Sequence, residues 1–117
     1  MVGCAEYRMY QEIDQFAKKT ADEYIDRVFT DEYVTKQVTY DSVWEEFLDF
    51  IIFEFGKKYH LTDDQIWEDD KMTDIAFAKT KYVTYRFVVK LKEITGKDYE
   101  YPYNINPLEY EQQGKNS

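Results

Sequence analysis

Carboxylates are the side chains of this sequence whose number and spacing could support chemistry. Eleven Asp and Glu residues fall between Asp41 and Asp74, against three lysines. Paired carboxylates can act as general acid and base, but that chemistry needs two carboxyl groups held across a substrate cleft with their pKa values pushed apart. Glu45, Glu46 and Asp49 are instead neighbours on one predicted helix and should point into solvent. The sequence therefore does not predict an enzyme.

Metal binding and nucleophilic catalysis are the other chemistries to consider. The stretch from Asp63 to Asp74 has the length and the terminal aspartates of a calcium loop. However, Glu68 stands at the sixth position, where the sharp turn of such a loop requires glycine. The single cysteine, Cys4, and the single histidine, His60, cannot supply a zinc site, and their spacing matches no nucleophile motif. No metal or cofactor is predicted.

A protein interface is the function that the acidic run favours. Asp41, Glu45 and Asp49 recur at four-residue steps, which is about 6 Å of helix rise each. A DNA duplex carries one phosphate charge about every 1.7 Å, so such a line of carboxylates is a thinner version of the same charge. Phe50 and Phe53 lie among the acids, and an aromatic anchor inside a charged rim is typical of specific interfaces. The predicted partner-binding residues are Asp41, Glu45, Glu46, Asp49, Phe50, Phe53, Asp63, Asp64, Glu68, Asp69 and Asp70. The alternative is an acidic surface that is merely solvated.

The distribution of charge indicates what kind of partner to expect. Residues 41–74 carry −8 and residues 75–97 carry +5, within an overall net charge of −9. Direct binding to nucleic acid or to an anionic membrane needs clustered Lys and Arg. The basic residues of 75–97 are expected to form a solvated or internally paired helix face. We therefore expect a basic protein partner, with no direct contact to nucleic acid or membrane.

These observations favour a small acidic binding protein that inhibits a basic, nucleic-acid-binding partner by occupying its DNA- or RNA-binding surface. In charge and size the chain resembles the DNA-mimicking inhibitors that phages and mobile elements use against restriction enzymes and CRISPR nucleases. One alternative is an immunity or antitoxin protein that neutralises a nuclease toxin. Another is a phage or plasmid structural protein that self-associates, for example as a homodimer. The lone cysteine and the lack of a leader-like stretch suggest the cytoplasm of a bacterial host.

The apolar spacing predicts a mainly α-helical fold, a single compact domain of three to five helices. A first helix is expected from Glu6 to about Val28, and another from a cap at Asp41 or Ser42 to about Tyr59. Between them, residues 33–40 are rich in β-branched and aromatic side chains and could form a short strand.

The C-terminal half is harder to assign. Thr62 with Gln65 predicts a capping box that opens a short helical turn. Residues 82–91 alternate as a strand does, but the overall length, a cap at Thr73 and a stop at Gly96 favour a long helix. Residues 1–103 are assigned to the single domain, and the polar residues 104–117, which include Pro107, to a flexible tail.

Overall fold

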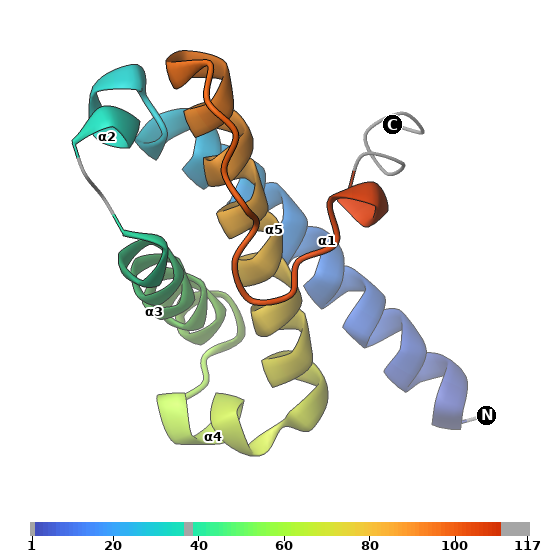
Figure 1. Ribbon diagram of the computed structural model, residues 1–117. Coiled ribbons are helices and arrows are strands. Elements are labelled where there is room, and N and C mark those ends of the chain that lie inside the picture. The colour runs from blue at the N-terminus through green and yellow to red at the C-terminus, as the bar shows by residue number, and fades with distance from the viewer. Residues whose placement is uncertain (1, 37–38, 111–117) are drawn as a thin grey trace.

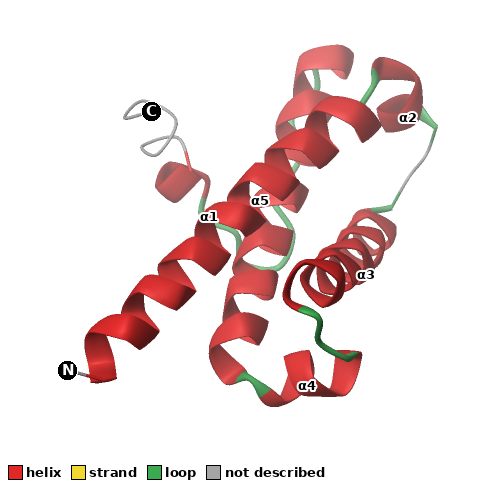
Figure 2. Ribbon diagram, turned by 180° about the vertical axis from the view of Figure 1, so that it is seen from behind, coloured by secondary structure: helices red, strands yellow, loops and turns green. Residues whose placement is uncertain are grey.

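The computed structural model describes residues 2–36 and 39–110, with side chains from residue 7 onward. Five helices follow one another along the chain: α1 Val2–Val28, α2 Asp31–Thr35, α3 Tyr40–Tyr59, α4 Asp63–Glu68 and α5 Asp70–Thr95 (Figure 1). A further helical turn covers 107–110, which places the helix count just above the predicted range. The described residues contain no strand (Figure 2). The predicted mainly α-helical fold is thus confirmed.

Side-chain caps set the starts of the helices, although two of them differ from the prediction. The capping box of Thr62 and Gln65 is present at the start of α4, as expected. The predicted caps of α3 at Asp41 or Ser42 are wrong, because Thr39 caps it by accepting a hydrogen bond from the Ser42 N–H at 3.0 Å. The Thr73 cap is also wrong, because α5 begins four residues earlier, at a cap formed by Asp69.

Neither predicted short strand is present in the described residues. Residues 82–91 lie within α5, where Val83 and Phe87 are one helical turn apart and fully buried. Tyr85 lies on another side of α5 and is also buried. The strand-like alternation arises because neighbours cover this helix on several sides, so that its apolar residues do not form one stripe. Within 33–40, α2 continues to Thr35 and α3 starts at Tyr40, while residues 37–38 lie outside the described part.

Helix α5 is the centre of the fold and contacts each of the other four helices. Helices α1 and α3 lie on either side of it, with α2 and α4 near opposite ends (Figures 1 and 2). The largest fully buried side chains are Phe47 and Phe55 of α3 and Phe87 of α5. The fully buried hydroxyls of Thr80 and Thr84 donate to carbonyl oxygens one turn earlier, at 2.7 and 2.9 Å, so that neither hydroxyl is left without a partner in the core.

The segment after α5 returns along that helix and packs on it (Figure 1). The ring of Tyr85 lies between those of Tyr101 and Tyr110, with centroids 5.4 and 4.8 Å away and both pairs stacked. Ile105 is buried as well. The described part of the predicted tail, 104–110, therefore contacts the helical domain, and 111–117 lie outside the described residues.

Candidate protein-binding face

Four aromatic side chains from three helices and the C-terminal segment meet at the surface. Trp44 of α3 stacks on Phe77 of α5 with ring centroids 6.4 Å apart. Phe77 also contacts Trp67 of α4 at 6.0 Å, and Tyr103 contacts Trp44 at 4.7 Å. We call these four residues the aromatic face. Trp67 is 43% exposed, and Phe77 and Tyr103 are each 37% exposed, so their rings are accessible to a partner.

The short helix α4 positions Trp67 at the surface. The capping box at Thr62 fixes the start of this six-residue helix, and the fully buried Ile66 anchors it to the core. Because consecutive residues on a helix point about 100° apart, burying Ile66 turns Trp67 away from the interior. The ring of Trp67 consequently lies against Phe77 instead of filling the core.

A tight turn holds Tyr103 against Trp44. Tyr103 and Asn104 both have left-handed backbones, with φ of 59° and 57°, and the Ile105 N–H donates to the Pro102 carbonyl at 3.2 Å. This is the pattern of a type I′ turn, which costs energy when its central residues are not glycine. The Tyr103 hydroxyl donates a hydrogen bond to Asp41. Burial, this hydrogen bond and the charges of Asp41 and Glu45 raise the pKa of Tyr103 to about 12.

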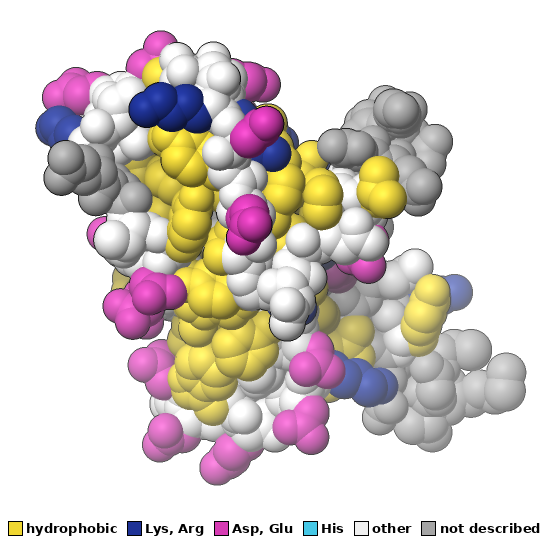
Figure 3. Space-filling view, viewed as in Figure 1, with side chains coloured by type: hydrophobic (Ala, Val, Ile, Leu, Met, Phe, Trp, Pro, Cys, Tyr) yellow, Lys and Arg dark blue, Asp and Glu magenta, His cyan; other side chains and the backbone are white. Residues whose placement is uncertain are grey.

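Carboxylates surround the aromatic face. Asp41 and Glu45 flank Trp44 in sequence, Asp63, Asp64 and Glu68 belong to α4 with Trp67, and Asp70 and Asp74 precede Phe77 by two turns and one turn. We call these seven residues the acidic rim, and all seven are exposed. Figure 3 shows a band of hydrophobic side chains over α3, α4 and α5 whose lower half has acidic side chains on both margins and below it.

No cation of the described structure forms an ion pair with the acidic rim. Across residues 7–36 and 39–110, five ion pairs form, and their acids are Asp14, Asp22, Asp31, Glu32 and Glu54. All five lie outside the rim. The negative charge of the rim is therefore available to a partner.

In the described structure, the contacts between cations and aromatic rings also lie outside the aromatic face. Seven Lys or Arg groups lie over aromatic rings in the described structure, 4.4 to 5.8 Å from the ring centroids. They cover Phe16, Phe50, Phe53, Tyr10, Tyr82 and Tyr101. None of these rings belongs to the aromatic face, so in the described part of the chain its π surfaces carry no cation.

The two predicted aromatic anchors lie away from this face. Phe50 is half-buried and packs on Tyr24 of α1 at 5.1 Å, with Arg27 over its ring. Phe53 is 60% exposed, but Lys57 lies over its ring, 5.1 Å from the centroid. On α3 both residues lie on a different side from Trp44, because six and nine residues correspond to rotations of about 240° and 180°. Neither residue joins the aromatic cluster.

The predicted acids divide between the rim and other places. Asp41, Glu45, Asp63, Asp64, Glu68 and Asp70 are rim residues. Glu46 instead accepts a hydrogen bond from the Tyr33 hydroxyl at 2.9 Å, on the side of α3 towards α2. Asp49 is exposed one turn beyond Glu45.

Asp69 has a structural role. Its Oδ1 accepts hydrogen bonds from the backbone N–H groups of Lys71 and Met72, both at 3.1 Å, which caps α5. Its Oδ2 accepts a hydrogen bond from the Tyr10 hydroxyl of α1 at 3.0 Å. Asp69 thus joins the start of α5 to the third turn of α1, and it is half-buried in contrast to the rim acids.

Trp44, Trp67, Phe77 and Tyr103 were not predicted from the sequence as binding residues. Trp44 lies one turn from Leu48 on the apolar side of its helix, where periodicity favours a buried position. Phe77 did carry a signal, since it falls outside the core stripe formed by Ala76, Thr80 and Val83. A large aromatic next to such a stripe, and one turn after Asp74, is a candidate for a surface contact.

Other potential sites in the described structure show little sign of chemistry. No three His, Cys, Asp or Glu side chains converge as metal ligands would among the described residues. The stretch 63–74 forms α4, the Asp69 cap and the first turn of α5 rather than a loop. His60 ends α3 in a left-handed conformation, with its backbone N–H donating to the Gly56 carbonyl. The side chain of Cys4 lies outside the described part. Within that part, no helix is both long and apolar enough to cross a membrane.

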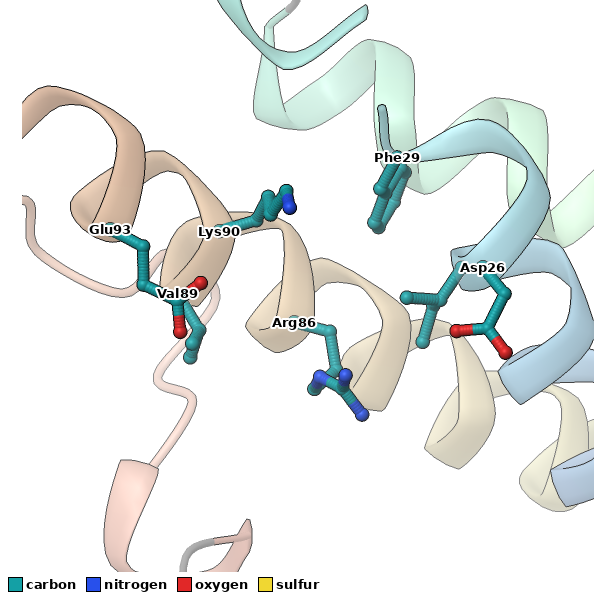
Figure 4. A pocket seen from close by; sticks show the side chains of 7 residues that line it. Asp26, Phe29, Arg86, Val89, Lys90 and Glu93 are labelled. Atoms are coloured by element: carbon teal, nitrogen blue, oxygen red, sulfur yellow. The ribbon is translucent and has the colours of Figure 1, made fainter. Parts of the chain in front are cut away.

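A cavity of about 230 Å³ lies between the end of α1 and the second half of α5 (Figure 4). Arg86 and Lys90 line it together with the opposing charges of Asp26 and Glu93. Both cations are engaged, because Arg86 donates to the Tyr82 hydroxyl at 2.9 Å and Lys90 pairs with Asp31 at 3.2 Å. The cavity thus has balanced charges, which gives it no preference for an anion or a cation.

Comparisons with protein-family models, with curated proteins and with solved structures gave no match for this chain.

Proposed function

We propose that this protein is a non-enzymatic inhibitor of a basic, nucleic-acid-binding protein in a bacterial cell, and that it binds this partner through the aromatic face and the acidic rim. The observation that carries the proposal is a surface cluster of four aromatic rings, three of them exposed, surrounded by seven carboxylates that form no ion pair within the described structure. Specific interfaces combine aromatic anchors at the centre with a charged margin. The negative margin fits a positive partner surface.

The two parts of the face have different physical roles. Exposed carboxylates attract a basic surface over about 10 Å at moderate salt, which accelerates encounter. Rings such as Trp67 lose water on contact and slow dissociation. A protein that occupies a DNA- or RNA-binding surface in this way excludes the nucleic acid, because both ligands need the same cations.

Self-association through an acidic middle and a basic helix is less favoured by the contacts. The basic residues of α5 are largely engaged within the fold, with Lys79 paired to Asp14 at 2.7 Å and Lys90 paired to Asp31. Lys92 lies 4.4 Å from the centroid of the Tyr101 ring. Little positive charge on this helix is therefore left to bind the acidic rim of a second copy.

Site-specific photocrosslinking tests the proposal. A benzophenone side chain replaces Lys81, which is exposed one turn after Phe77, and in a matched control it replaces Glu32 on α2, near the opposite end of α5. We expect position 81 alone to capture a nucleic-acid-binding protein, and the purified inhibitor to displace DNA or RNA from it in a gel-shift titration. Capture of a protein that binds this chain and its nucleic acid at the same time would contradict the proposal.

A further inference from the structure

We infer that the aromatic face recognises arginine side chains, so that the segment of the partner that it binds is an arginine-rich helix or loop. The inference rests on the proposed function and deepens it by naming the side chains that the partner contributes. The charge of the rim attracts arginine and lysine equally, whereas the aromatic face should prefer arginine.

The rings of the face are suited to stacking with cations. Indole is the aromatic group that attracts a cation most strongly, and both tryptophans of the chain, Trp44 and Trp67, belong to the face. Elsewhere in the described structure the protein's own cations cover rings, as Lys57 covers Phe53. In the described structure no cation lies over the aromatic face, so the exposed parts of the Trp67, Phe77 and Tyr103 rings are open to a cation from outside.

The carboxylates stand where a stacked guanidinium could donate to them. Asp63 and Asp64 precede Trp67 by one turn, and Asp74 precedes Phe77 by one turn, so these acids lie beside the rings on the helix surface. The guanidinium of arginine is planar, with a weakly hydrated face for stacking and in-plane N–H groups that donate to carboxylates. It can therefore contact a ring and an adjacent carboxylate together.

Lysine cannot make the same pair of contacts as well. Its ammonium is a compact and strongly hydrated charge with no planar face. Placed over Trp67, as Lys57 is placed over Phe53, it keeps the electrostatic attraction to the ring but gains no stacked surface, and it cannot donate in the ring-parallel plane to Asp64 at the same time. A lysine-rich segment should consequently bind mainly through the charge of the rim.

Intrinsic fluorescence measures this preference directly, because the only two tryptophans of the chain lie on the face. Octapeptides of arginine and of lysine, equal in charge, are titrated into the full-length protein at low and at moderate salt. We expect the arginine peptide to bind about fivefold or more tightly than the lysine peptide, with the difference persisting at moderate salt. In Trp67→Ala and Phe77→Ala the arginine preference should fall towards one, because arginine binding weakens much more than lysine binding.

Phe53→Ala is the matched control, because it removes an exposed ring outside the face. It should keep the arginine preference, and melting curves should show that all three variants are folded. Equal affinity for the two peptides would overturn the inference and leave the proposed function standing. An arginine preference that survives both Trp67→Ala and Phe77→Ala would also overturn it. Failure of both peptides to bind at low salt would contradict the inference and the proposed function together.

Discussion

The ring of Trp44 on α3 stacks on the ring of Phe77 on α5, with centroids 6.4 Å apart and planes inclined by 23°. This contact joins two helices at the surface, and the ring of Trp67 on α4 also packs on Phe77, with centroids 6.0 Å apart. Rings that hold one another in place lose little conformational freedom when a partner covers them. The aromatic face is thus pre-organised for binding.

Removing a ring of the aromatic face should weaken binding much more than folding. For Trp67→Ala we expect faster dissociation of the partner, with a loss of about 2 kcal/mol or more in binding free energy, as at interface hot spots. Because Trp67 is 43% exposed, the change in the free energy of unfolding should stay near 1 kcal/mol. Surface plasmon resonance and urea unfolding measure the two quantities. A variant with normal binding kinetics would show that the face is not the interface.

Reversing charge in the acidic rim should slow association. In the double variant Asp64→Lys and Glu68→Lys, two attractive charges become repulsive, so the association rate should fall and depend less on salt. Stopped-flow kinetics at several salt concentrations measure both effects. The control is the double variant Glu12→Lys and Glu23→Lys on α1, outside the rim, which changes the net charge by the same amount and should leave the association rate nearly unchanged. Equal effects of the two changes would mean that only net charge matters.

Phenylalanines 47 and 53 should differ sharply in their contribution to stability. Phe47 is fully buried, so Phe47→Ala should lower the free energy of unfolding by about 3–5 kcal/mol through lost transfer energy and the cavity left behind. Phe53 is 60% exposed, and Phe53→Ala should cost less than about 1 kcal/mol. Chemical denaturation followed by circular dichroism compares them. A large loss for Phe53→Ala would be inconsistent with its surface position.

Stability should fall at alkaline pH as tyrosines ionise. Burial raises the pKa of Tyr24 to about 12, and burial with the hydrogen bond to Asp22 raises the pKa of Tyr82 to about 12. In the unfolded chain tyrosine ionises near pH 10. A raised pKa means that the folded state keeps its proton longer, so this stability is complete below pH 10 and is lost as the pH rises from about 10 to 12.

Urea midpoints measured between pH 9 and 11.5 check this expectation. In Tyr82→Phe, which cannot ionise at this position, the decline above pH 10 should be shallower than in the unaltered protein. Tyr7→Phe is the matched control, since Tyr7 is 66% exposed, and it should reproduce the full decline. Stability that stays constant up to pH 11.5 would contradict the raised pKa values of Tyr24 and Tyr82.

Local patterns in the sequence are sufficient to predict the main helices and the distribution of charge. Apolar residues at three- and four-residue steps, the capping box of Thr62 and Gln65 and the glycine stop at Gly96 are local features, and the structure contains the helices and ends that they predict. The eleven carboxylates of residues 41–74 can be counted directly in the sequence. Local hydrogen bonding and periodicity suffice for these features, because they depend on residues within one or two turns of each other.

Tertiary structure decided which side chains are covered. Periodicity gives the directions in which Trp44, Phe47 and Phe50 point around α3. It does not show which of these directions faces α1, α5 or solvent. In the fold, Phe50 packs on Tyr24, and Trp44 meets Phe77 and Tyr103, from positions 33 and 59 residues further along the chain. Asp69 was likewise predicted to contact a partner, but in the fold it caps α5 and accepts a hydrogen bond from the Tyr10 hydroxyl. The aromatic face exists because three helices and the C-terminal segment meet, and packing of that kind is not visible in any single helix.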